Sequence, residues 1–283
     1  MIRSFLSFVF GVCAVLATLV TAPATWVSHN IADEDNYVAF AEPIARDAGF
    51  RGELADALSE SLVKDSTLPV SLQPVAKEAI VRIANELADK PGFVTAWNDT
   101  QRQSHKIMLG DQKDLPARLD SSSRFAIDLG PLEKFVVDQV NKDLPFTVPA
   151  SDQTIVAFNG APQDHTLERV RESPMYARDG LIIVAVFVAL TLAFARRRSI
   201  AVAWLGLGAI AAAGLLKGAA SVGLPQVLDR NTAPTPFAKA ALDVFLTRAN
   251  ESFDHSLVVL AIGGAVAAAV GVLSRLVTSR SGV

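Results

Sequence analysis

The chain has little of what usually marks an enzyme or a disulfide-stabilised exported domain. Its 283 residues include one cysteine, Cys13, and four histidines. One cysteine excludes an internal disulfide, so any exported domain must be stabilised by its core. The sequence contains neither H-E-x-x-H nor His-x-His, and no glycine-rich phosphate loop or nucleophile elbow. We therefore expect no metal, no cofactor and no enzymatic activity.

Long apolar runs are the main positive feature of the chain. They cover residues 5–27, 181–195, 200–216 and 257–277. A helix needs about 20 apolar residues to cross a bilayer. The sequence thus predicts a mainly α membrane protein with four transmembrane helices. The first run is longer than the ~7–15 apolar residues of a signal peptide, so we expect an uncleaved span. Cleavage near Ala22–Ala24 is the alternative.

Acidic residues are missing beside six arginines that flank these runs, Arg3, Arg196, Arg197, Arg198, Arg275 and Arg280. Cytoplasmic segments carry an excess of basic residues. We therefore predict a multi-pass plasma membrane protein with both termini in the cytoplasm. The predicted organisation is an N-terminal helix at 1–27, an extracytoplasmic domain at 28–179 and three helices at 180–283 with an outer loop at 225–255.

The predicted outer domain is strongly acidic. It holds 16 Lys and Arg against 25 Asp and Glu, a net charge of −9. This balance argues against nucleic acid as a partner, because nucleic-acid-binding domains carry basic patches. It also argues against a domain that lies flat on anionic lipid headgroups.

The pattern within 28–179 indicates an α+β domain that is mostly helical. Apolar residues recur at helical spacing over 50–64 and 74–88, and a further helix is expected from Pro91 to Leu109 before Gly110. Alternation over 124–129 and 154–158 predicts a small two-strand element in which Phe125, Ile127 and Leu129 face one side. A helix is expected between the strands, over 131–140.

The segment Trp97–His105 is the best candidate for ligand or partner binding. Asn98, Arg102 and His105 are spaced i, i+4 and i, i+7, so they share one helical face beside Trp97. An amide, a guanidinium and an imidazole together suit a carboxylate or a phosphate. The alternative is structural: Trp97 fills the core, and Arg102 and His105 pair with nearby acids.

Two weaker signals have ordinary explanations. Ser61 and Lys64 match the S-x-x-K pattern of penicillin-interacting enzymes, but K-T-G is absent and the pair suits the polar side of a helix. The histidines suit a solvated surface, with pH sensing as the alternative.

The predicted spans contain one polar site and stripes of small residues. Lys217 is expected to reach the outer interface or to mark a pathway with Asp254 as its partner. Small residues that allow close helix packing are Gly214, Gly218, Gly263, Ala267 and Gly271. In the outer loop, an amphipathic run with Phe237, Ala241 and Phe245 predicts a helix on the outer surface or docked on the large domain.

The layout resembles a group of actinobacterial membrane proteins. The resemblance rests on the Trp97, Asn98, Arg102, His105 helix, on the AIDLGPL turn at 126–132 and on a high content of Ala and Val. It implies the four-span topology and a cell-envelope setting, and no activity.

From these patterns we expect a non-enzymatic envelope protein whose outer domain binds a partner or senses a condition. Its surroundings would be the lipid bilayer and either a membrane or envelope protein or further copies of itself. The alternatives are a subunit of a transport or channel assembly and, third, an envelope enzyme.

Overall fold

The computed structural model describes residues 2–65, 70–71, 73–87, 89–110, 126–143, 154–157, 164–230 and 235–280. In chain order the elements are α1 (Ile2–Val27), the π-helix η1 (Ser28–Ala32), α2 (Glu34–Ala41), the 3-10 helix η2 (Glu42–Arg46), α3 (Ala48–Asp65), α4 (Gln73–Leu87), α5 (Pro91–Leu109), β1 (Ala126–Asp128), α6 (Gly130–Asp143), β2 (Ile155–Ala157), α7 (Asp164–Phe194), α8 (Arg198–Arg230) and α9 (Pro236–Arg280).

The chain forms two compact units. The span unit comprises Met1–His29, Glu172–Asp229 and Ala249–Val283, and the α+β unit comprises Asn30–Arg171 and Arg230–Arg248. Most of the predicted outer loop at 225–255 is helical, because α8 extends to Arg230 and α9 begins at Pro236.

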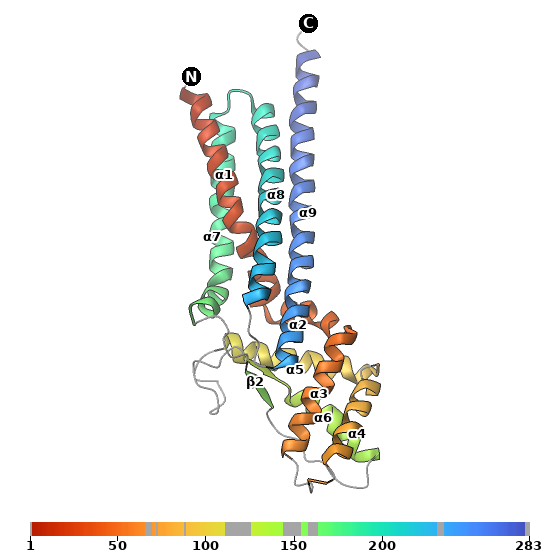
Figure 1. Cartoon of the computed structure of the whole chain (residues 1–283). Coiled ribbons are helices and arrows are strands. Elements are labelled where there is room, and N and C mark those ends of the chain that lie inside the picture. Colours follow the sequence, from red (N-terminus) through yellow and green to blue (C-terminus); the bar gives the residue numbers. More distant parts are fainter. Residues whose placement is uncertain are drawn as a thin grey trace. The chain divides into compact units, whose positions relative to one another are not determined.

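The described residues confirm the prediction of four helices that are long and apolar enough to cross a membrane. They cover Ile2–Ala32, Leu167–Phe194, Arg198–Gln226 and Pro236–Leu276. Figure 1 shows α1, α7, α8 and the later part of α9 running alongside one another. Their outward side chains are large, apolar and exposed, including Phe5, Leu181, Ile183, Val258 and Ile262. An apolar surface of this kind suits contact with lipid. The backbone N–H and C=O groups need no partner from lipid, because they bond to one another within each helix.

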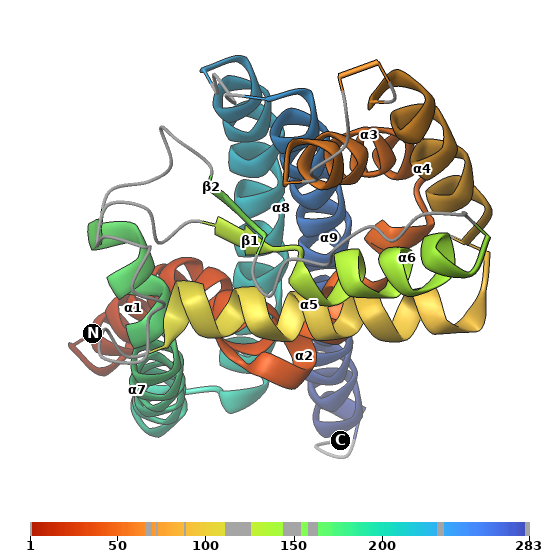
Figure 2. The ribbon, with the colours of Figure 1, turned by 90° about the horizontal axis from the view of Figure 1, so that it is seen from below.

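In the α+β unit, α3 packs on α4, and α5 packs on α2, α6 and β1. Figure 2 shows α5 and α6 side by side. The core is apolar and contains Phe50, Leu54, Leu58, Leu62, Ile80, Phe93, Trp97, Leu132, Val136 and Val140. The predicted apolar faces of α3 and α4 are confirmed at Leu58 and Ile80. Val75 was expected on the same face but is 66% exposed, because the buried face of α4 is formed by Ala76, Ile80, Ile83 and Ala84, and Val75 lies beside it.

The predicted two-strand element is confirmed, but its buried face is not the one expected. β1 and β2 pair antiparallel with Ile127 opposite Val156. Ala126 and Asp128 are buried, and so is Leu129 just after β1, whereas Ile127 is only partly covered. Two hydrogen bonds hold Asp128 in this position: Ser104 Oγ accepts from Asp128 N at 3.0 Å, and Asp128 Oδ1 accepts from Gly130 N at 2.9 Å. Phe125 and Phe158, which were expected in the strands, lie outside the described residues.

The amphipathic run predicted in the outer loop forms the beginning of α9. Phe237 and Ala241 are buried in the core of the α+β unit, and the ring of Phe237 lies 5.8 Å from that of Phe50. Phe245 contacts Phe40 edge-on, with 5.3 Å between ring centroids. The helix therefore docks on the domain core, which was one of its two predicted positions.

Candidate functional site

Helix α5 carries the predicted site, and local sequence signals fix both of its ends. Pro91 occupies the first turn, where backbone N–H groups have no partner within the helix, so the N–H that proline lacks is not needed. At the other end, the Gly110 N–H donates to the Lys106 carbonyl at 2.8 Å. The predicted bounds, Pro91 to Leu109, are confirmed. All four predicted site residues lie on this helix, and each contacts the segment that follows α1.

Trp97 belongs to the core. Its side chain is 2% exposed and meets Phe50 edge-on, with 5.3 Å between ring centroids. The indole Nε1–H donates to the Ala41 carbonyl at 3.0 Å. Beside it, Asn98 Nδ2 donates to Glu42 Oε2 at 3.3 Å. Both contacts join α5 to the boundary between α2 and η2.

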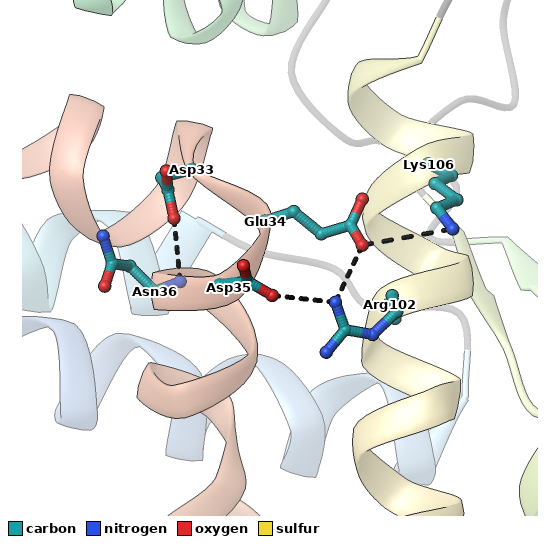
Figure 3. Close-up of polar contacts among 6 residues, drawn as sticks. All are labelled: Asp33, Glu34, Asp35, Asn36, Arg102 and Lys106. Atoms are coloured by element: carbon teal, nitrogen blue, oxygen red, sulfur yellow. Dashed lines mark hydrogen bonds and ion pairs between the residues drawn. The ribbon is translucent and has the colours of Figure 1, made fainter.

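Arg102 forms the charged centre of this face (Figure 3). Its Nη1 lies 3.0 Å from Glu34 Oε1 and 2.9 Å from Asp35 Oδ1, and Lys106 approaches Glu34 at 4.0 Å. Hydrogen bonds to Asp35, and then to Glu34, raise the pKa of Arg102. The guanidinium is thus already matched by two carboxylates, which confirms the predicted pairing with nearby acids.

The same acids stabilise the start of α2. The Asp33 side chain caps the helix by accepting from the backbone N–H of Asn36 at 2.9 Å. Glu34 and Asp35 occupy the first turn, where the helix dipole favours negative charge. The first turn of α2 is therefore stabilised twice, by the Asp33 cap and by the ion pairs of Arg102 with Glu34 and Asp35 (Figure 3).

His105 was expected on the surface, and this prediction was wrong. Its side chain is buried, and Nε2 lies 3.0 Å from the carbonyl oxygen of Ile31. Since a carbonyl only accepts, Nε2 carries the proton in this contact. The imidazole also packs on Tyr37, with 5.1 Å between ring centroids. The burial arises because the segment after α1 folds back over α5.

A buried polar layer lies under this face and was not predicted. Tyr37 Oη donates to Gln101 Oε1 at 3.2 Å, and burial raises the pKa of Tyr37. Thr100 and Ser104 are fully buried, and Ser104 Oγ donates to the Thr100 carbonyl. A signal was available: Phe93, Trp97, Thr100 or Gln101, and Ser104 follow the spacing of a buried helical face.

Near the sheet, the side chain of Asp128 is buried. Burial raises the pKa of Asp128, against the lowering effect of the backbone N–H groups of Gly130 and Thr154. Its main-chain N–H bond to Ser104 ties β1 to α5. Asp128 therefore belongs to the polar layer that connects α5 with its neighbours.

The predicted anion-binding face is, in this structure, a set of internal bonds. Each of Trp97, Asn98, Arg102 and His105 has a partner between residues 31 and 42. Within the described residues, no group of three or more His, Cys, Asp or Glu side chains is placed to hold a metal. The side chains of Ser61, Lys64 and His165 lie outside the described part, so the prediction that Ser61 and Lys64 form the polar side of a helix is not tested.

In the span unit, the predicted partners Lys217 and Asp254 meet. Lys217 Nζ on α8 forms an ion pair with Asp254 Oδ2 on α9. The other oxygen, Asp254 Oδ1, is buried and has no hydrogen-bond partner among the described residues. Close by in sequence, Trp26 Nε1 donates to Ser252 Oγ at 3.2 Å, which joins α1 to α9.

The small-residue stripes were placed partly on the wrong residues. A methyl group at Gly214, Gly218 or Gly263 would meet no atom within 4 Å among the described residues. The close contact of α8 and α9 lies at Gly206 and Gly264, and farther along at Gly271 against Ser199 and Ala203. Gly271 is therefore confirmed. On α9 the packed face contains Gly264 and Ala268 rather than Gly263 and Ala267. Helix α8 contacts the face that is shifted by one residue from the predicted one.

No protein-family model, curated protein or solved structure matches this chain.

Proposed function

We propose that the chain is a non-enzymatic plasma membrane protein of the cell envelope, with both termini in the cytoplasm. Its α+β unit lies outside, where it binds a partner or senses a condition. The charge distribution supports this orientation: arginines without acids flank the spans at one side, and residues 28–179 carry a net charge of −9.

Helix α9 carries the proposal. It is one helix from Pro236 to Arg280. Its first residues, including Phe237, are buried in the core of the α+β unit, and its later part contains Asp254 and Gly264, which contact α8. A change of packing around Phe237 acts on the same helix that contacts α8. This continuity supports a domain whose state is passed to the spans.

The α5 face has a supporting role in this proposal. Its polar groups bond to residues 31–42, the first segment of the α+β unit. The face therefore stabilises that segment and is not an open site for an anion. Partner recognition then falls to other surfaces of the unit. The Arg102→Ala, His105→Ala double variant is the test: a partner lost while the fold is retained contradicts this assignment.

Hydrogen exchange of the full chain in detergent tests the coupling. Lys217→Met removes the ion pair of the spans, and we expect altered amide protection in α3 and α5. Inserting three glycines after Arg248 interrupts α9 and should abolish that effect, since coupling between sites requires a shared element. Ile262→Ala, on an exposed face of α9, is the control. Unchanged protection in Lys217→Met contradicts a sensing role through α9.

The orientation has its own test. In a Cys13→Ala background, a cysteine introduced at Asp111 should react with a membrane-impermeant thiol reagent in intact cells, and one at Ser199 should not. The reverse labelling pattern would overturn the proposed topology and with it the outer location of the α+β unit.

A subunit of a transport assembly is the second candidate, and the Lys217–Asp254 pair favours it. Ionisable residues within membrane-spanning helices often mark substrate or ion pathways, and Lys217 and Asp254 form such a pair. If the pair conducts, Asp254→Asn abolishes flux in proteoliposomes while the protein still folds. If it only joins α8 to α9, no flux is measured for either protein.

A further inference from the structure

A groove of about 770 Å³ lies in the span unit between α1, the end of α7 and the start of α8. Figure 1 shows these three helix ends beside one another, close to the N-terminus. The volume is within the ~300–1,000 Å³ of small-molecule sites. None of its lining residues was part of the predicted sites.

The lining is polar at one end and apolar along the rest. The polar residues belong to the first turns of α1, the last turn of α7 and the loop before α8: Ser4, Ser7, Thr191, Arg196 and Arg197. Beyond them the walls are apolar, with Phe8, Val12, Leu16, Trp204 and Leu207. Trp204 is 69% exposed, so its ring is accessible to a bound molecule.

Helix contacts define the floor of the groove. A methyl group on Gly208 would meet the side chain of Val15, so α1 and α8 are in close contact there. Toward the polar end, Ser7 Oγ donates to the Thr191 carbonyl at 2.9 Å, which joins α1 to α7. The walls are therefore held by packing and a hydrogen bond.

The length of the groove matches one leaflet of a bilayer. From Ser4 to Leu16 along α1 the rise is about 18 Å, and from Ile200 to Ala211 along α8 it is about 16 Å. Half of a hydrocarbon core is about 15 Å. An acyl chain that starts at the polar end would reach the middle of the membrane along the groove.

The charge at the polar end determines the kind of lipid. Arg196 and Arg197 are exposed, and within the described residues neither forms an ion pair. A guanidinium binds phosphate oxygens through two parallel hydrogen bonds and stays charged at any physiological pH. Two such groups beside an apolar groove complement an anionic phosphate attached to a long hydrocarbon chain.

We propose that this groove binds one anionic glycerophospholipid. Its phosphate contacts Arg196 and Arg197, and one acyl chain lies along Phe8, Val12 and Trp204. Under the orientation that the arginines predict, the lipid comes from the inner leaflet. Binding of the lipid does not depend on the function proposed above, and only the assignment to the inner leaflet rests on the orientation proposed there.

Native mass spectrometry of the full chain in detergent, with phosphatidylglycerol or phosphatidylcholine added, measures this binding. We expect one phosphatidylglycerol per chain. Its apparent affinity should fall about fivefold for each of Arg196→Ala and Arg197→Ala and about thirtyfold for both together. Arg198→Ala, a neighbouring arginine that does not line the groove, is the matched control and should retain the lipid.

Tryptophan quenching locates the acyl chain. Phosphatidylglycerol with brominated chains should quench fluorescence in the wild-type protein more than in Trp204→Phe. In Val12→Trp, which fills the groove, lipid retention should be lost. Equal retention of both lipids, or equal losses in Arg198→Ala and Arg196→Ala, would show bulk lipid only and overturn the proposal. A second chain occupying the groove, seen as a dimer that excludes lipid, would overturn it as well.

Discussion

Replacing Trp97 tests whether α5 is a structural element of the α+β unit. The indole is 2% exposed, lies edge-on to Phe50 and donates to the Ala41 carbonyl at 3.0 Å. Trp97→Ala empties a site of this size, which typically costs about 3–5 kcal/mol of unfolding free energy. We expect a loss in this range, because the surrounding residues belong to several helices.

Trp97→Phe separates packing from hydrogen bonding. It keeps an aromatic ring against Phe50 but leaves the Ala41 carbonyl without its donor. Ala41 is fully buried, and an unsatisfied buried acceptor costs about 1–3 kcal/mol. The phenylalanine variant should therefore lose less stability than the alanine variant, and both should lose more than Arg102→Ala, whose guanidinium is partly exposed.

Pulse proteolysis of the full chain in urea measures this order, because it follows the α+β unit even if the spans stay helical in detergent. With a urea dependence of about 2 kcal/mol per molar, Trp97→Ala should lower the midpoint by about 1.5–2.5 M. A shift no larger than that of Arg102→Ala would refute the core assignment. Loss of partner binding in Arg102→Ala without any shift would restore the binding-site hypothesis.

Three further predictions concern other parts of the fold. Phe237→Ala should destabilise the α+β unit by about 3–5 kcal/mol in the same assay, whereas Lys239→Ala, on the exposed side of α9, should change little. Burial raises the folded-state pKa of Asp128 above its ordinary value of 3.8. The wild type should therefore lose stability relative to Asp128→Asn as the pH rises from 3.8 through the folded-state pKa, and the difference between the two proteins should be constant outside that window. Urea midpoints measured across this pH range check the prediction. Gly264→Leu should separate α8 from α9 and reduce the yield of folded protein in size-exclusion chromatography, while Gly263→Leu, facing open space among the described residues, should behave as wild type.

Features that depend on local chemistry were predictable from the sequence. The four spans follow from composition and length, and the bounds of α5 follow from Pro91 and Gly110. Asp33, Glu34 and Asp35 stand at the start of α2, and helix starts favour acids whatever else surrounds them. These signals act within one turn and need no knowledge of distant contacts.

Features that depend on distant partners were not predictable in this way. On α9, small residues between Gly263 and Gly271 lie on more than one face of the helix. Which face packs, the one with Gly264 or the one with Gly263, therefore depends on the position of α8. The buried face of β1 carries Asp128, whose main-chain N–H donates to the Ser104 hydroxyl on α5, a partner 24 residues away. His105 is buried because the segment after α1 returns to α5, a contact between residues 74 positions apart.

The place of Phe237 in the core has a consequence for biosynthesis. Phe50 and Trp97 are synthesised early, but Phe237 follows Trp97 by 140 residues, after α7 and α8. At about 5–20 residues per second, the ribosome needs about 7–28 s to cover that distance. During this time the nascent α+β unit lacks one wall, and its aromatic residues remain open to the solvent. We therefore expect the newly made chain to require a holding chaperone on the side where this unit emerges, and to be most sensitive to proteolysis before α9 is complete.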